Sequence, residues 1–202
     1  RDKIFSVGTS KDIEEIISSI WNELDILGVS FIRCGVFIIN EAHEKINTYL
    51  SAPDGKALAA FELAYDTNDI AKNVVSHWKK NKIYQTSWSK REFLAFMADL
   101  IDKGLLKDPA SYQGSEHPPE HLYLNFAPFE QGMIYVGNIE AFTADELDLV
   151  QSIANAFSIA YARYEDFNQL EKAKKSAEDS LMELKATQAQ LIQSEKMASL
   201  GE

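Results

Sequence analysis

The chain has 202 residues, of which 46% are hydrophobic and 11% aromatic, so it can form one hydrophobic core and still leave a segment outside that core. Acidic residues outnumber basic residues by 31 to 20, and the net charge of -11 argues against nucleic acid as a partner because it would repel a phosphate backbone. No apolar run approaches the roughly 20 residues of a membrane span, and the single cysteine, Cys34, is typical of a reducing compartment. We therefore expect a cytoplasmic protein with no membrane segment in this chain.

The N-terminal region predicts one helix and three strands. Apolar residues at helical spacing follow the N-cap residue Ser10 and stop before Gly28. Residues 31–39 and 46–50 are rich in β-branched and aromatic side chains, which predicts a hairpin. A turn then leads to a further strand at 58–63.

The middle of the chain predicts two capped helices, a short strand and a loop. Asn68 is placed to cap the first helix, and the strand is expected at 83–86. Ser89 and Glu92 have the spacing of a capping box, in which each side chain bonds a backbone amide of the other residue. Residues 108–120 are rich in proline and poor in apolar side chains, which predicts a surface loop.

The C-terminal region predicts a second hairpin and a very long helix. Strands are expected at 122–129 and 133–139, with aromatic side chains suited to a half-buried sheet. Thr143 and Glu146 form a second capping box, which marks the start of a helix. No proline or glycine occurs in 145–200, so no residue there ends the helix. A helix of that length cannot pack on its own domain throughout.

Beyond Tyr164 the apolar residues of this helix narrow to a seam that repeats three and four residues apart. Lys174, Gln188 and Glu195 occupy core positions of the same repeat, where polar groups reduce stability while fixing register and oligomeric state. The pattern predicts a moderately stable parallel homodimer. The alternative is one amphipathic helix that folds back on the domain. The predicted seam consists of Phe167, Leu170, Ala177, Leu181, Leu184, Gln188, Leu191 and Ala198.

The order of the predicted elements resembles a GAF domain over about residues 11–164. The stretch 132–137 followed by 142–147 is similar to the closing strand and helix of that family. PAS-like domains are the nearest alternative, and the long helix after the last hairpin favours GAF. The resemblance implies an α+β fold with an antiparallel sheet and flanking helices. It divides the chain into a sensor domain, 1–164, and a coiled-coil signalling helix, 165–202.

The last residues of the chain, 190–202, closely resemble the approach to the phosphoacceptor histidine of sensor histidine kinases. This resemblance implies that a kinase core follows in the parent chain and that a response regulator acts downstream. The phosphoacceptor histidine and the ATP-binding sequence are not among these 202 residues. We therefore expect this chain to be regulatory and not itself an enzyme.

The GAF resemblance also implies a small-molecule pocket between the sheet and the helices that follow it. Arg33 is the residue expected to contact an anionic ligand, because an arginine on an apolar strand is costly to bury without a partner. A buried ion pair, or a side chain that reaches solvent at the strand end, are the alternatives for Arg33. The sequence identifies no cofactor. The predicted ligand-binding residues are Arg33, Phe37, Trp78, Trp88, Tyr123 and Asn125.

Two other groups of reactive residues are better explained without a site. His117, Glu120 and His121 could hold a metal ion, but the prolines between them do not allow helical ligand geometry, so an ordinary polar loop is expected. Cys34 lies in an apolar stretch, where a thiol usually packs as a small hydrophobe. One cysteine also leaves no partner for the disulfide cycle of the GAF-fold methionine sulfoxide reductases.

Three functions therefore remain open at the level of the sequence. The first is a sensor module of a two-component histidine kinase, which passes the state of a ligand or partner through a dimeric coiled coil. The second is a dimerisation and spacer module without a ligand, for which the seam is sufficient and a filled interior is expected. The third, a small enzyme on a GAF-like fold, has no nucleophile or metal motif to support it.

Overall fold

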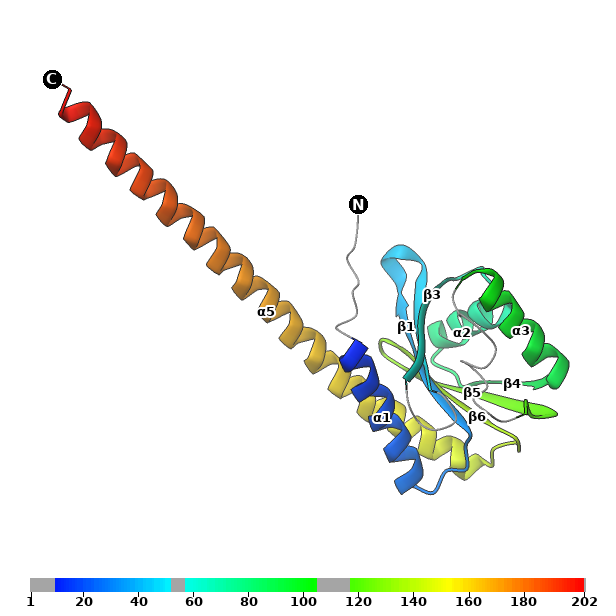
Figure 1. Ribbon diagram of the computed structural model, residues 1–202. Helices are drawn as coiled ribbons and strands as arrows, with labels where there is room; N and C mark the ends of the chain where they lie inside the picture. The colour runs from blue at the N-terminus through cyan, green and yellow to red at the C-terminus, as the bar shows by residue number, and fades with distance from the viewer. Residues whose placement is uncertain (1–9, 52–56, 105–116, 202) are drawn as a thin grey trace. The chain divides into compact units, whose positions relative to one another are not determined.

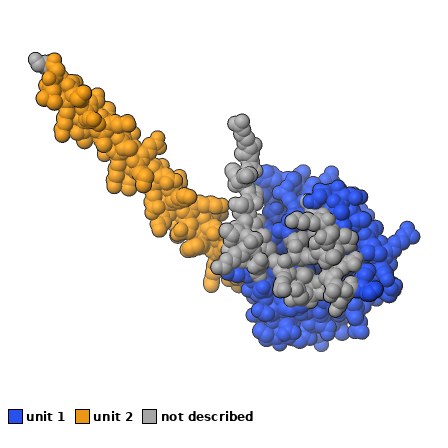
Figure 2. Space-filling view, in the orientation of Figure 1, with its two compact units in different colours: residues 1–158 blue, residues 159–202 orange. Residues whose placement is uncertain are grey.

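The computed structural model describes residues 10–51, 57–104 and 117–201. The chain forms two compact units, residues 1–158 and residues 159–202 (Figure 2). One helix, α5 (Ala144–Ser199), begins in the first unit and supplies the described structure of the second. The remaining helices and all the strands described here belong to the first unit.

The first unit is built on a six-stranded sheet in the order β3-β2-β1-β6-β5-β4. Every pair of neighbouring strands is antiparallel, with a register irregularity between Leu50 and Ser51. Together with the helices, this arrangement is an α+β fold, as the sequence predicts. The strands are β1 (Arg33–Asn40), β2 (Lys45–Ser51), β3 (Ala57–Ala64), β4 (Tyr84–Ser89), β5 (His121–Phe129) and β6 (Gly132–Asn138), and a short 3-10 helix, η1 (Glu41–His43), joins β1 to β2.

Helices cover both faces of this sheet (Figure 1). Helices α2 (Asp69–Lys79) and α3 (Lys90–Asp102) pack on one face and enclose the main hydrophobic core with it. Helix α1 (Ser10–Ile26) and the first turns of α5 lie on the other face. The central strands are therefore buried on both sides, which explains why β6 is buried along its whole length.

Three of the four predicted helix caps are confirmed, and the side chain of Ser10 lies outside the described residues. The Asn68 side chain accepts a hydrogen bond of 2.8 Å from the backbone amide of Ala71 at the start of α2. Ser89 and Glu92 form the reciprocal capping box of α3. At the start of α5 the Glu146 carboxylate accepts from the Thr143 amide at 2.8 Å, and the Thr143 hydroxyl accepts from the Glu146 amide at 3.3 Å. Each cap satisfies backbone donors that a helix start leaves without partners.

One close approach fixes the turn between β5 and β6 against β1. A Cβ atom on Gly132 would collide with the carbonyl oxygen of Phe37, so only glycine fits this position. The backbone amide of Ile39 also donates to the carbonyl of Gln131 at 2.9 Å. The turn is thus held by the backbone of the neighbouring strand.

The remaining expectations are met with small shifts of the element ends. The strand expected at 83–86 forms as Tyr84–Ser89 and continues up to the cap of α3. Of the loop predicted at 108–120, residues 108–116 lie outside the described residues, and 117–120 form neither helix nor strand. Among the helices described, none has the length and apolar character needed to cross a bilayer.

Candidate functional site

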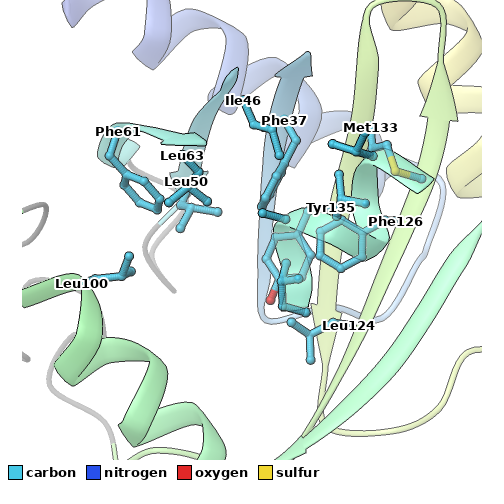
Figure 3. Packing of buried hydrophobic residues seen from close by; sticks show 14 of the residues in the cluster. Phe37, Ile46, Leu50, Phe61, Leu63, Leu100, Leu124, Phe126, Met133 and Tyr135 are labelled. Atoms are coloured by element: carbon cyan, nitrogen blue, oxygen red, sulfur yellow. The ribbon is translucent and has the colours of Figure 1, made fainter. Parts of the chain in front are cut away.

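A small cavity lies between the sheet and helices α2 and α3. Its volume is about 20 Å³, which is room for about one water molecule. Figure 3 shows Phe61 and Leu63 of β3 on one side of this region and Phe126 and Tyr135 of β5 and β6 on the other. The lining residues are Phe37, Thr48, Leu50, Phe61, Leu63, Ile70, Trp88, Phe96, Leu124, Phe126 and Tyr135.

Thr48 is the polar exception in an apolar wall. Its side chain has 0% of its surface exposed, and it extends from β2 between Phe37 and Phe61 of the neighbouring strands. The Oγ1 atom of Thr48 has no hydrogen-bond partner among the described residues. A buried hydroxyl in this state costs roughly 1–3 kcal/mol. The Thr48 hydroxyl is therefore a buried hydrogen-bonding group of the cavity wall without a partner among the described residues, and the lining residue Tyr135 carries a second buried hydroxyl.

Of the predicted ligand-binding residues, Phe37 and Trp88 line this cavity. Trp88 comes from the edge strand β4 and is only partly buried, and its ring lies 4.8 Å from that of Phe96 on α3. These two rings form the outer wall of the cavity. A ligand role for Phe37 and Trp88 stays a prediction.

Arg33 is buried on the same side of the sheet but does not line the cavity. It is 3% exposed, and its guanidinium carbon lies 4.9 Å from the centre of the Phe93 ring on α3. A cation over an aromatic face in a desolvated setting is favourable by about 2 kcal/mol. Part of the stabilisation of this buried charge therefore comes from a ring, which was not among the alternatives that the sequence suggested.

Tyr123 and Asn125 lie on the opposite face of the sheet from the cavity. Their neighbours Leu124 and Phe126 belong to the core under α2 and α3, and adjacent side chains of a strand point to opposite faces. The Asn125 amide accepts from the Gln85 side chain at 2.8 Å and donates to the Val136 carbonyl at 3.4 Å. The structure therefore does not bring these two residues to the cavity, and it gives Asn125 a structural role within the sheet.

Trp78 is also outside the cavity, at the turn between β5 and β6. Its indole N–H donates to the carbonyl of Phe129 at 2.9 Å. On the α5 side of the sheet, Gln151 donates to the neighbouring carbonyl of Pro128 at 2.8 Å. Helices α2 and α5 thus bind consecutive carbonyl groups of one strand end. The sequence contains no signal for this arrangement, because both bonds end on backbone atoms.

Two further contacts fix α5 to the same turn. The Ser158 hydroxyl donates to the side chain of Gln131 at 2.9 Å. The rings of Phe129 and Phe157 meet edge to face with centres 5.2 Å apart, an arrangement that favours aromatic pairs. The β5–β6 turn is therefore the place where the sheet holds the first turns of α5.

The second candidate site is the exposed surface of α5 beyond the sheet. From Gln169 to Gly201 every residue is exposed. The large apolar residues of the predicted seam each expose more than half of their surface, although leucine and phenylalanine are normally buried. Four further large apolar residues in 169–201 are exposed but lie outside the predicted seam. They are Met182, Ile192, Met197 and Leu200.

Cys34 is a buried free cysteine on β1. Burial raises the pKa of the Cys34 thiol to about 12, although a hydrogen bond with the Ser51 side chain opposes the shift. The thiol is therefore protonated at neutral pH and is a poor nucleophile. Within 10–51, 57–104 and 117–201, no three His, Cys, Asp or Glu side chains come together as a metal site would require.

The chain was compared with known protein families and with curated proteins. No family model and no curated protein matches it. The function is therefore inferred from three structural features: the cavity, the β5–β6 turn and the exposed seam of α5.

Proposed function

We propose that the chain is a GAF-like regulatory module of a sensor histidine kinase, which passes the state of its α+β domain to the kinase through a parallel dimeric coiled coil formed by α5. The observation that carries this proposal is the exposed apolar seam on a helix of 56 residues. The role is regulatory, and we assign no catalytic step to this chain.

The spacing of the seam supports a second copy of the chain as its partner. Phe167, Leu181 and the three polar core residues fall at one heptad position, and Leu170, Leu184 and Leu191 fall at the other. Burial of one leucine side chain is favourable by roughly 1.5–3 kcal/mol. A seam with several such residues can hold two helices together, and the polar positions keep the dimer marginal.

The connection to a kinase is supported by the sequence of the last turns of α5. Residues 190–202 resemble the segment that leads to the phosphoacceptor histidine in sensor kinases. In a dimer, the two copies of this segment would lie side by side. A change in their register or crossing angle would then reach the kinase core directly.

The contacts at the β5–β6 turn offer a route from the domain to the helix. Trp78 on α2 and Gln151 on α5 bind the adjacent carbonyls of Phe129 and Pro128. A displacement of α2 relative to the sheet would therefore act on a turn that also holds α5. Such a route transmits a signal only if the ligand or partner binds two arrangements with different affinity.

A second function is favoured by the small volume of the cavity. About 20 Å³ is far below the roughly 300–1,000 Å³ of pockets for drug-sized ligands. A filled interior is what a dimerisation and spacer module without a ligand would have. In this alternative α5 has the same role, and the signal comes from elsewhere in the parent protein.

The seam is tested by two aspartate substitutions at neighbouring positions of α5. Leu181 is 51% exposed and lies in the seam, whereas Met182 is 74% exposed and lies outside it. We expect Leu181→Asp to weaken the dimer at least tenfold, because a carboxylate would enter an apolar interface. Met182→Asp adds the same charge one residue away and should leave the dimer intact. The measurement is the dissociation constant from analytical ultracentrifugation.

Equal weakening by both substitutions would show that the helix associates through charge or through another face. A wild-type chain that is monomeric at all concentrations would show that α5 does not form a dimeric coiled coil. Either result would contradict the proposal.

A further inference from the structure

The chemistry of the cavity walls restricts what the cavity can bind. Of the eleven described residues that line the cavity, ten are aromatic or aliphatic, and Thr48 is the remaining one. No charged residue is among these eleven. An ion transferred into such a site would lose its hydration without gaining a partner. The walls therefore select against charged molecules.

Arg33 does not change this conclusion. The sequence suggests that Arg33 contacts an anion, but its guanidinium lies over the Phe93 ring and the residue is not part of the cavity wall. An anion held by Arg33 would have to sit outside the cavity. The ligand class that fits the cavity is thus different from the one that the sequence favours.

Thr48 provides a hydrogen-bonding group without a partner at the cavity wall. Its Oγ1 atom is buried and has no hydrogen-bond partner among the described residues. A water molecule in the cavity would need two to four polar partners to be well held, and the wall supplies few. A ligand with a single hydroxyl or carbonyl group would satisfy Thr48 while its remaining atoms contact the apolar wall.

We propose that the cavity between the sheet and helices α2 and α3 binds a small, uncharged, mainly apolar molecule that forms one hydrogen bond with Thr48. Six of the lining residues are aromatic, so a flat ring is the shape that packs best among them. The inference rests on the proposed regulatory function and names the ligand class that would set the state of the domain.

Entry requires the outer wall to move. The present volume of about 20 Å³ is too small for a ring. Trp88 and Phe96 are partly buried and stand on separate elements, an edge strand and a helix. Rotation of these two rings would enlarge the cavity without breaking a strand pair. The ligand then stabilises an open arrangement, in which these two rings are rotated away from the cavity.

Three probes of similar size separate the effects of an aromatic ring, a hydroxyl group and a charge on binding. Phenol has a ring and one hydroxyl, toluene has the ring alone, and benzoate adds a charge. We expect phenol to bind about 3–10-fold more tightly than toluene, which corresponds to one net hydrogen bond. Benzoate should not bind. Binding is followed in the intact chain by the methyl resonances of the lining residues Leu50, Leu63, Ile70 and Leu124.

Thr48→Val removes the hydroxyl and keeps the shape of the side chain. In this variant phenol and toluene should bind equally well. The matched control is Thr86→Val, because Thr86 lies on β4 of the same sheet but is not a lining residue. This control should retain the preference for phenol.

Three results would overturn the proposal: no probe shifts the methyl resonances, benzoate binds as well as phenol, or Thr48→Val retains the preference for phenol. The wild-type comparison of the three probes does not depend on how any variant folds. Light scattering on the same samples tests the dimer independently of the ligand. If the chain is a dimer but binds no probe, the proposed ligand class is wrong and the proposed coiled coil is unaffected.

Discussion

The sheet domain and the second half of α5 both contain regularly placed apolar residues, which are buried in the domain and exposed on the helix. In the domain, side chains such as Phe126 and Met133 are almost completely buried by other parts of the same chain. On α5 beyond the sheet, Leu170 and Leu184 expose more than half of their surface. The domain thus completes its own core, whereas the helix leaves a seam that only another surface can complete. Apolar residues that the chain buries and apolar residues that it leaves exposed are therefore separated along the sequence.

The largest loss of stability is expected for a substitution in the domain core. Phe126→Ala removes a ring that contacts Phe37, Tyr84 and Tyr135. We expect a loss of about 3–5 kcal/mol in the free energy of unfolding. Chemical denaturation followed by tryptophan fluorescence measures it. The loss should not depend on protein concentration, since this ring is buried within one chain, and a concentration-dependent loss would break the distinction between the two regions.

The next effect concerns the polar core of the seam and has the opposite sign. Gln188→Leu should strengthen the dimer by roughly 2–4 kcal/mol, because it buries one leucine from each chain. Its effect should appear only in concentration-dependent measurements. In the proposed parent kinase the same change should lock one output state, since a stable seam no longer has two arrangements of similar energy. Unchanged kinase regulation would argue against transmission through the helix.

A smaller effect is expected at the start of α5. Thr143→Ala removes the cap that bonds the Glu146 amide and should cost about 1 kcal/mol of stability. The matched control is Thr187→Ala, because the Thr187 hydroxyl bonds only the Glu183 carbonyl within the exposed part of the helix. That control should be neutral or stabilising by a few tenths of a kcal/mol. Thermal unfolding measures the loss of stability in each variant. An equal loss in both would show that the Thr143 cap does not stabilise the protein more than an ordinary threonine of the helix does.

The smallest effect is a pH dependence at the capping box of α3. Hydrogen bonds from the backbone and then the side chain of Ser89 lower the pKa of Glu92. A lowered pKa in the folded state means that the stabilisation is present above the ordinary carboxyl pKa and is lost as the pH falls through the folded value. Glu92→Gln should therefore differ from the wild type at neutral pH and converge with it in acid. A difference that stays constant down to pH 3 would contradict this cause.

The same capping box can be examined directly by titration. In Ser89→Ala the pKa of Glu92 should move back toward its ordinary value but not reach it, because the bond from the Ser89 backbone amide remains. Carbon-detected NMR of the Glu92 carboxyl group measures the shift. A pKa that does not change on loss of the hydroxyl would show that the backbone bond is the whole cause.

Local signals in the sequence predicted the elements well. Asn68, Ser89 and Thr143 were identifiable as caps because capping depends on residues within one helical turn of each other. The absence of proline and glycine predicted the length of α5 for the same reason. Helix caps and helix length depend mainly on residues that are close together in the sequence.

The candidate site was less predictable because it depends on which face of a strand meets which helix. β5 is almost entirely buried, so its pattern does not show whether Asn125 or Phe126 faces α2 and α3. Two-sided burial removes the alternation that would otherwise identify the core face. The bond from Trp78 to the Phe129 carbonyl joins residues 51 positions apart and uses a backbone atom. Residue types alone therefore predict neither the hydrogen-bond partner of Trp78 nor its position in the sequence.

If the exposed seam of α5 pairs two copies of the chain, as we propose, the solution mass of the protein should depend on whether the seam is present. Light scattering would compare residues 1–202 with residues 1–164 over a range of concentrations. We expect twice the single-chain mass for residues 1–202 and a clear shift toward the monomer for residues 1–164. A monomeric full-length chain, or a dimer that is equally stable without residues 165–202, would contradict the proposal.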